Sequence, residues 1–113
     1  MEDFLKDIRK EKQIKNVEIY IQKGQLYVFV YSNTGTFSIS RQAFEAIENY
    51  NKEYNFILIN KSKNEFYFLK YNNFEVKNLS QCFKSTIKES LYFGKQILQN
   101  KTEREKIIKL FKE

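Results

Sequence analysis

Short apolar runs separated by polar turns dominate the pattern along this 113-residue chain. These runs predict strands at residues 17–22, 25–31, 36–39, 55–60 and 65–71. Lys23 and Gly24 lie between the first two runs and are typical of the tight turn of a β-hairpin. The runs 25–31 and 55–60 are apolar at consecutive positions, which indicates strands that are buried on both faces.

Apolar residues at helical spacing alternate with these runs. They predict helices over about 2–12, 41–53 and 78–99, and a last short helix that begins after Thr102. Ser40 is placed to cap the second helix, and the sequence NLSQ at 78–81 resembles a capping box at the start of the third. Strands interspersed with helices predict an α/β fold: a small central mixed sheet of four to five strands flanked by helices. We expect residues 1–113 to form one domain, with 78–113 as a candidate interaction appendage.

The composition excludes several kinds of chemistry. The chain has no histidine, one cysteine (Cys82) and three glycines. Catalysis by a histidine-activated nucleophile, a thiolate metal cluster and a glycine-rich phosphate loop are therefore excluded. Without a secretory signal or a long apolar segment, the sequence predicts a cytoplasmic protein with no membrane association and no resident cofactor.

The net charge of +6 is unevenly distributed. Residues 1–54 are balanced, whereas residues 55–101 have a net charge of +5. A one-sided basic half favours an anionic partner, although solvated surface lysines would give the same sums. The candidate anion-facing residues are Lys84, Lys88 and Lys95, which share one side of the expected helix 78–99, together with Lys61 and Lys63 in the preceding turn.

The stretch from Asn16 to Tyr71 resembles the restriction-endonuclease-like, or PD-(D/E)xK, nuclease fold, and in outline archaeal Holliday junction resolvases. The resemblance covers about half of the chain and rests on the order of elements, including YVFVY at 27–31 and the helix that follows. It implies that Glu18 takes the place of the first metal-binding acid, Phe29 that of the second acid and Tyr31 that of the lysine. It also implies a homodimer.

Nucleases of this family use carboxylates to hold Mg²⁺, which activates water and stabilises charge on the phosphate. Glu18 alone, with a phenyl ring in place of the second acid, is a poor magnesium site. The resemblance therefore implies a nuclease-like fold without metal or activity: an interaction module that binds a protein partner, nucleic acid or both in DNA processing or defence.

Two alternatives remain open at this point. Glu75 and Lys77 form a literal Glu-x-Lys, with Glu65 ten residues earlier, and in that register the chain would be an active Mg²⁺-dependent nuclease. That register requires a strand after residue 99, where the sequence predicts a helix instead. Alternatively, the small size and the many lysines suit an inhibitor or adaptor encoded by a mobile element.

The C-terminal sequence REKIIKLF partly resembles the clamp-binding peptide of replication proteins. Ile107, Leu110 and Phe111 occupy its hydrophobic positions, whereas Arg104 stands where glutamine is expected. These three residues are candidates for partner binding. The alternative is a terminal amphipathic helix that packs on the core of its own domain.

Overall fold

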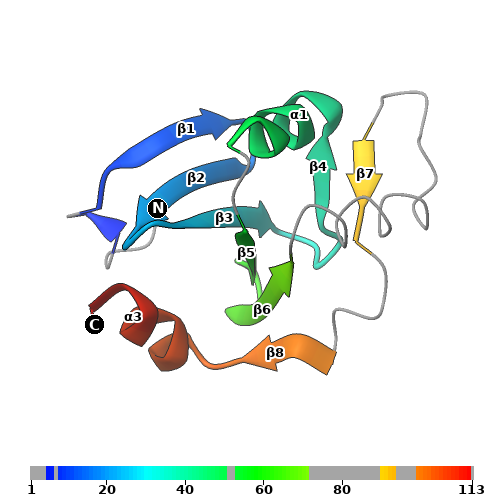
Figure 1. Cartoon of the computed structure of the whole chain (residues 1–113). Helices are drawn as coiled ribbons and strands as arrows, with labels where there is room; N and C mark the ends of the chain where they lie inside the picture. Colours follow the sequence, from blue (N-terminus) through cyan, green and yellow to red (C-terminus); the bar gives the residue numbers. More distant parts are fainter. Residues whose placement is uncertain (1–4, 7, 51–52, 72–89, 94–98, 113) are drawn as a thin grey trace.

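A computed structural model of the chain describes residues 5–6, 8–50, 53–71, 90–93 and 99–112 (Figure 1). The elements in chain order are β1 (Lys10–Ile14), β2 (Val17–Gln22), β3 (Gln25–Ser32), β4 (Ser38–Ser40), α1 (Arg41–Asn49), β5 (Tyr54–Asn60), β6 (Glu65–Tyr71), β7 (Ser90–Tyr92), β8 (Lys101–Thr102) and α3 (Arg104–Lys112). The expected α/β class with a mixed sheet is confirmed.

The main sheet has six strands in the order β1-β2-β3-β5-β6-β8. Strands β1, β2 and β3 form an antiparallel meander, β5 lies parallel to β3, and β6 and β8 continue in antiparallel fashion. Helix α1 lies in the connection between the parallel strands, as such a connection requires. The two continuously apolar strands, β3 and β5, are the central pair of the sheet.

The hairpin between β2 and β3 closes through a two-residue turn. Gln22 pairs with Gln25, and both residues between them have positive φ, 53° at Lys23 and 79° at Gly24. Positive φ at both central positions is the signature of a type I′ turn, whose twist matches that of the flanking strands. This turn fixes the register of the whole hairpin.

Replacing Gly24 with alanine should lower the free energy of unfolding by about 1 kcal/mol, because the left-handed conformation is unfavourable for a residue with a Cβ. A Cβ at this position would meet no atom within 4 Å, so the cost is conformational rather than steric. Urea denaturation measures the effect, and an unchanged m value shows that only stability has changed. Asparagine tolerates this conformation, so Gly24→Asn should lose less. Equal losses for the two variants would contradict this explanation.

One face of the sheet packs against α1 and β4. Ser40 caps α1 by accepting a hydrogen bond from the backbone N–H of Ala43 at 3.1 Å, as expected from the sequence. Ala43, Ala46 and Ile47 of the helix then lie in a core with the alternate residues of β2, β3 and β5 that point to this side. Figure 1 shows α1 and α3 on opposite faces of the sheet.

The other face is covered by α3 and by Leu5 near the N-terminus. Its core is rich in aromatic rings and contains Leu5, Tyr20, Tyr27, Phe29, Ile57, Ile59, Phe66, Ile107 and Phe111. The ring of Phe111 lies 4.7 Å from that of Tyr27 and 5.7 Å from that of Phe29. This face also carries Glu18, a buried charged residue.

Three sequence predictions are corrected here. A helix over 2–12 is wrong at its C-terminal end, because residues 10–14 pair with β2 as a strand. A helix over 78–99 is wrong at residues 90–92, which form β7 and pair with β4 in a second, two-stranded sheet; residues 78–89 lie outside the described part. The main sheet has six strands rather than four to five, since β1 and β8 were not expected.

Strand β7 pairs with β4, which is distant in sequence, whereas β1 pairs with β2, the next strand along the chain; in both cases sheet pairing overrides local helical preference. Helix α1 is also shorter than expected and ends at Asn49. Neither helix of the described segments is long and apolar enough to cross a membrane.

Candidate functional site

The β2–β3 hairpin brings together the three residues that the nuclease resemblance singled out. Glu18 and Phe29 are direct cross-strand partners. Tyr31 is two residues beyond Phe29 and therefore points to the same face, with its ring stacked at 6.4 Å and 22° to that of Phe29. The three side chains thus form one cluster on the α3-covered face of the sheet.

Glu18 is only 4% exposed, and its charge is balanced by a lysine of the neighbouring strand. Lys10 Nζ lies 2.6 Å from Glu18 Oε2, and the same ammonium donates a 2.8 Å hydrogen bond to Gln13 Oε1. Burial of the Glu18 carboxyl disfavours its charged form, but the Lys10 ammonium and the Tyr31 hydroxyl favour it more strongly. The pKa of Glu18 therefore lies below its ordinary value of 4.5.

The second carboxylate oxygen of Glu18, Oε1, does not take part in the ion pair with Lys10. Glu18 Oε1 is buried and has no hydrogen-bond partner among the described residues. The hydroxyl of Tyr20, also on β2, is likewise buried without a hydrogen bond in the described part of the chain. Burial and the neighbouring Glu18 charge raise the pKa of Tyr20, so this phenol stays protonated.

Hydrocarbon fills the space opposite Glu18. Phe29 is fully buried and packs edge-on against Tyr20, with ring centroids 5.4 Å apart. Within the described ranges, no three aspartate, glutamate, cysteine or histidine side chains lie close enough together to hold a metal ion. Among the described residues, Glu18 is therefore not part of a metal-ligand cluster, and its carboxylate is held by an ammonium group.

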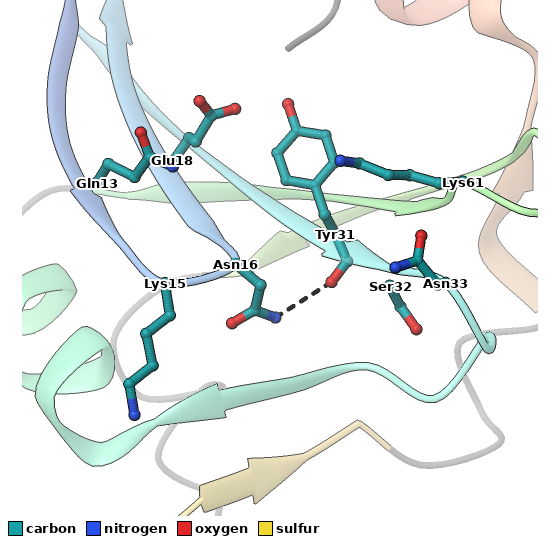
Figure 2. A pocket seen from close by; sticks show the side chains of 8 residues that line it. All are labelled: Gln13, Lys15, Asn16, Glu18, Tyr31, Ser32, Asn33 and Lys61. Carbon is teal, nitrogen blue, oxygen red and sulfur yellow. Dashed lines mark hydrogen bonds between the residues drawn. The ribbon is translucent and has the colours of Figure 1, made fainter.

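A polar pocket of about 270 Å³ opens beside this cluster (Figure 2). It is lined by Gln13, Lys15, Asn16, Glu18, Tyr31, Ser32, Asn33 and Lys61. Figure 2 shows the Glu18 carboxylate and the Tyr31 ring extending to the same side, with Lys61 reaching the ring, whereas Lys15 extends away from it. Lys61 Nζ lies 4.9 Å from the ring centroid of Tyr31, within the range of a cation–π contact.

Asn16 holds the strand ends around this pocket in place. The side-chain amide of Asn16 donates to the backbone carbonyl oxygens of Tyr31 at 3.2 Å and Ser38 at 2.9 Å. The backbone carbonyl of Asn16 accepts a hydrogen bond from the backbone N–H of Tyr31 at 3.0 Å. Lys61 N donates to Ser32 O at 2.8 Å, which anchors the turn between β5 and β6 to the end of β3. The pocket is thus built on paired strands and anchored turns.

Of the residues in the alternative nuclease motif, Glu65, Glu75 and Lys77, the structure describes only Glu65. Glu65 begins β6 and pairs with Lys101 of β8 at 2.9 Å, and this contact holds the pKa of Glu65 below its ordinary value. Glu75 and Lys77 lie outside the described residues. A second pocket, of about 590 Å³, is lined by Lys63, Asn64, Glu65, Phe66, Lys101, Thr102, Glu103, Arg104 and Glu105. Its three glutamates are interspersed with three basic side chains.

The predicted binding residues fall into three groups. Lys61 and Lys63 are exposed in the β5–β6 turn, one lining each pocket. The helical lysines, Lys84, Lys88 and Lys95, lie outside the described residues. Of the candidate partner-binding residues, Ile107 and Phe111 are buried in the core of their own domain, 1% and 6% exposed, and Leu110 is partly buried.

Sequence reasoning missed Lys10 and Asn16. Lys10 lies in a charged segment that reads as a helix, so the sequence gives no sign that it faces Glu18. Asn16 follows Lys15, whose φ of 53° marks a tight β1–β2 turn, and a Lys-Asn pair immediately before an apolar run is the only signal that could have indicated it. Comparison with known proteins finds no family model, no curated protein and no solved structure that matches the chain.

Proposed function

We propose that this chain is a non-catalytic, nuclease-like module that binds nucleic acid in DNA processing or defence. The observation that carries the proposal is the pairing of Glu18 with Lys10 at 2.6 Å, opposite the buried ring of Phe29. A lysine ammonium takes the place that a divalent cation would need, and β3 supplies no second carboxylate.

The strand order supports the nuclease-like part of the proposal. An antiparallel three-stranded meander, a helix and a strand parallel to the third is the layout that the resemblance implies. Mg²⁺ requires near-octahedral oxygen ligands, and hydrolysis requires the metal to activate water. Glu18 offers one buried oxygen beyond its ion pair, so the site is unsuited to that chemistry.

The basic turn between β5 and β6 supports the nucleic-acid part. Lys61 lines the pocket beside Glu18, and Lys63 lines the second pocket, whose other two basic side chains are accompanied by three glutamates. The turn therefore carries one exposed lysine beside each of the two pockets. Two positive charges in one short turn suit contact with the phosphates of a nucleic-acid strand.

Binding to DNA should weaken steeply with salt and depend on this turn. We expect the double variant Lys61→Ala/Lys63→Ala to reduce the slope of log K against log salt by about 2, since each phosphate contact contributes about 0.9. Gel shifts with single-stranded, duplex and branched DNA, from about 50 to 200 mM salt, measure this. The double variant Lys106→Ala/Lys109→Ala removes two exposed charges from α3 and should keep the native slope.

Three outcomes would contradict the proposal. If no DNA binds at about 50 mM salt, the basic residues serve solvation, and a protein partner, as for an adaptor from a mobile element, becomes the better proposal. If both double variants lose the same slope, the β5–β6 turn is not the contact surface. If the chain cleaves DNA in Mg²⁺ or Mn²⁺ and Glu75→Gln abolishes cleavage, the chain is an active nuclease that uses Glu65, Glu75 and Lys77.

A further inference from the structure

The pocket beside β2 and β3 contains a buried charged atom that the fold leaves without a partner. Glu18 lines the pocket and is 4% exposed; its Oε2 is bound by Lys10, the Tyr31 hydroxyl favours its charged form, and its Oε1 accepts no hydrogen bond from the described residues. A buried acceptor without a donor is costly, and the cost is greater for a charged one. The inner end of the pocket is therefore suited to a group with an N–H donor.

The part of the pocket near Lys61 is suited to a negatively charged group rather than to a donor. The ammonium group of Lys61 lies over the ring of Tyr31, whereas the Lys15 side chain, which also lines the pocket, extends away from that ring. Glu18 is already neutralised by Lys10, so the pocket as a whole is positively charged. Its outer part is therefore suited to an anion, and the Tyr31 ring lies between the two parts (Figure 2).

The volume limits the size of an occupant. At about 270 Å³ the pocket is close to the lower end, about 300 Å³, of the range typical of small-molecule sites. It has room for one planar polar ring, with a charged substituent at the opening. A duplex cannot enter a hollow of this size, but a single unpaired nucleotide can.

We propose that this pocket binds one nucleotide, free or at the end of a strand, with a base N–H donating to Glu18 Oε1 and the phosphate held by Lys61. The base lies against the ring of Tyr31, because stacking on an aromatic side chain is the usual way to hold an unpaired base. This inference rests on the proposed nucleic-acid function and specifies the part of the ligand that is read. Guanine, adenine and cytosine offer an amino group to a carboxylate. Thymine offers one N–H between two carbonyl groups, which repel the carboxylate, so thymine binds more weakly.

Calorimetric titration of the whole chain with 2′-deoxyguanosine 5′-monophosphate tests the proposal. Losing a hydrogen bond to a charged group costs about 1.5–3 kcal/mol, so Glu18→Gln should weaken binding about 10- to 100-fold. Lys61→Ala should weaken binding of the nucleotide but leave binding of the nucleoside 2′-deoxyguanosine unchanged. Lys63→Ala, in the same turn but not in this pocket, should bind as the native chain does.

Titrations with other ligands show whether the base, the phosphate or the end of a strand is recognised. Thymidine 5′-monophosphate should bind more weakly than the guanine nucleotide, and inorganic phosphate more weakly still. A linear single strand should compete with the nucleotide, whereas a circular single strand should not if a strand end is read. Equal affinity for inorganic phosphate and the nucleotide would overturn the proposal, as would native affinity in both Glu18→Gln and Lys61→Ala.

The outcome also distinguishes this inference from the proposed function. If the gel shifts show DNA binding that depends on the β5–β6 turn but no mononucleotide binds, the pocket proposal fails and the module function stands. If neither DNA nor nucleotide binds, both fail. Because Glu18→Gln changes a buried residue, the circular dichroism spectrum of this variant must match that of the native chain. If the spectra differ, the exposed Lys61→Ala variant decides the test.

Discussion

Replacing Phe29 with alanine is expected to lower the free energy of unfolding by about 3–5 kcal/mol, the usual cost of removing a fully buried aromatic ring. Phe29 is completely buried, and its ring contacts those of Tyr20, Tyr31 and Phe111. A loss of this size is a large part of the roughly 5–15 kcal/mol that stabilises a typical domain. Urea denaturation followed by far-UV circular dichroism measures it.

Phe68→Ala is the matched control, because it removes the same ring from a partly buried position in β6. It should cost clearly less than Phe29→Ala, and Phe29→Leu should fall between the two. The comparison bears on function as well as stability. If Phe29→Ala costs less than about 1 kcal/mol, the space opposite Glu18 is not filled by hydrocarbon, and the argument against a metal site there loses its basis.

Lys10→Met should destabilise the chain by removing the positive charge that balances Glu18. Breaking a fully buried ion pair in this way costs about 3–5 kcal/mol. Because the Lys10 side chain is 31% exposed, water can reach the carboxylate in its absence, and we expect about 2 kcal/mol at neutral pH. Chemical denaturation at a series of pH values measures the effect.

The pH dependence gives this prediction a definite sign. In the native chain the pKa of Glu18 is below 4.5, so its contribution to stability is present above that value and is lost as pH falls through the lowered pKa. Without Lys10, burial should raise that pKa above 4.5, so the variant loses stability as pH rises from about 4 to 7. The double variant Lys10→Met/Glu18→Gln should lack this dependence. If Lys10→Met is equally destabilised at pH 4 and pH 7, the loss does not arise from the Glu18 charge.

Both experiments examine the same physical question, which is what occupies the space between β2, β3 and the neighbouring elements. A hydrolytic metal site requires an open, wet space with several carboxylates, and the cost of burying them is offset by the metal. Here one carboxylate is offset by an ammonium, and the rest of the space is packed with rings. The opening that remains lies to the side, in the pocket with Tyr31 and Lys61.

The sequence by itself determined the centre of the fold. Continuous apolar runs mark β3 and β5 as the inner strands, because only strands covered on both faces tolerate them. Lys23 and Gly24 close β2 onto β3 through a two-residue turn, and such a turn sets one register. With that register fixed, the pairing of Glu18 with Phe29 and the position of Tyr31 on the same face follow from the sequence.

Only the tertiary structure decided the surroundings of that pair. Residues 10–14 are mostly charged and favour a helix locally, yet they pair with the free edge of β2, and a register shift between Lys10 and Lys12 interrupts this pairing. The position of Lys10 next to Glu18 depends on that irregular pairing, which no local pattern records. The pocket likewise requires Lys61 to meet Asn16 and Tyr31, and it does so only when β3 and β5 align in parallel. Strand pairing, between neighbouring strands for Lys10 and between distant ones for Lys61, overrides local preference, and this is the physical reason why the site was harder to predict than the strands that carry it.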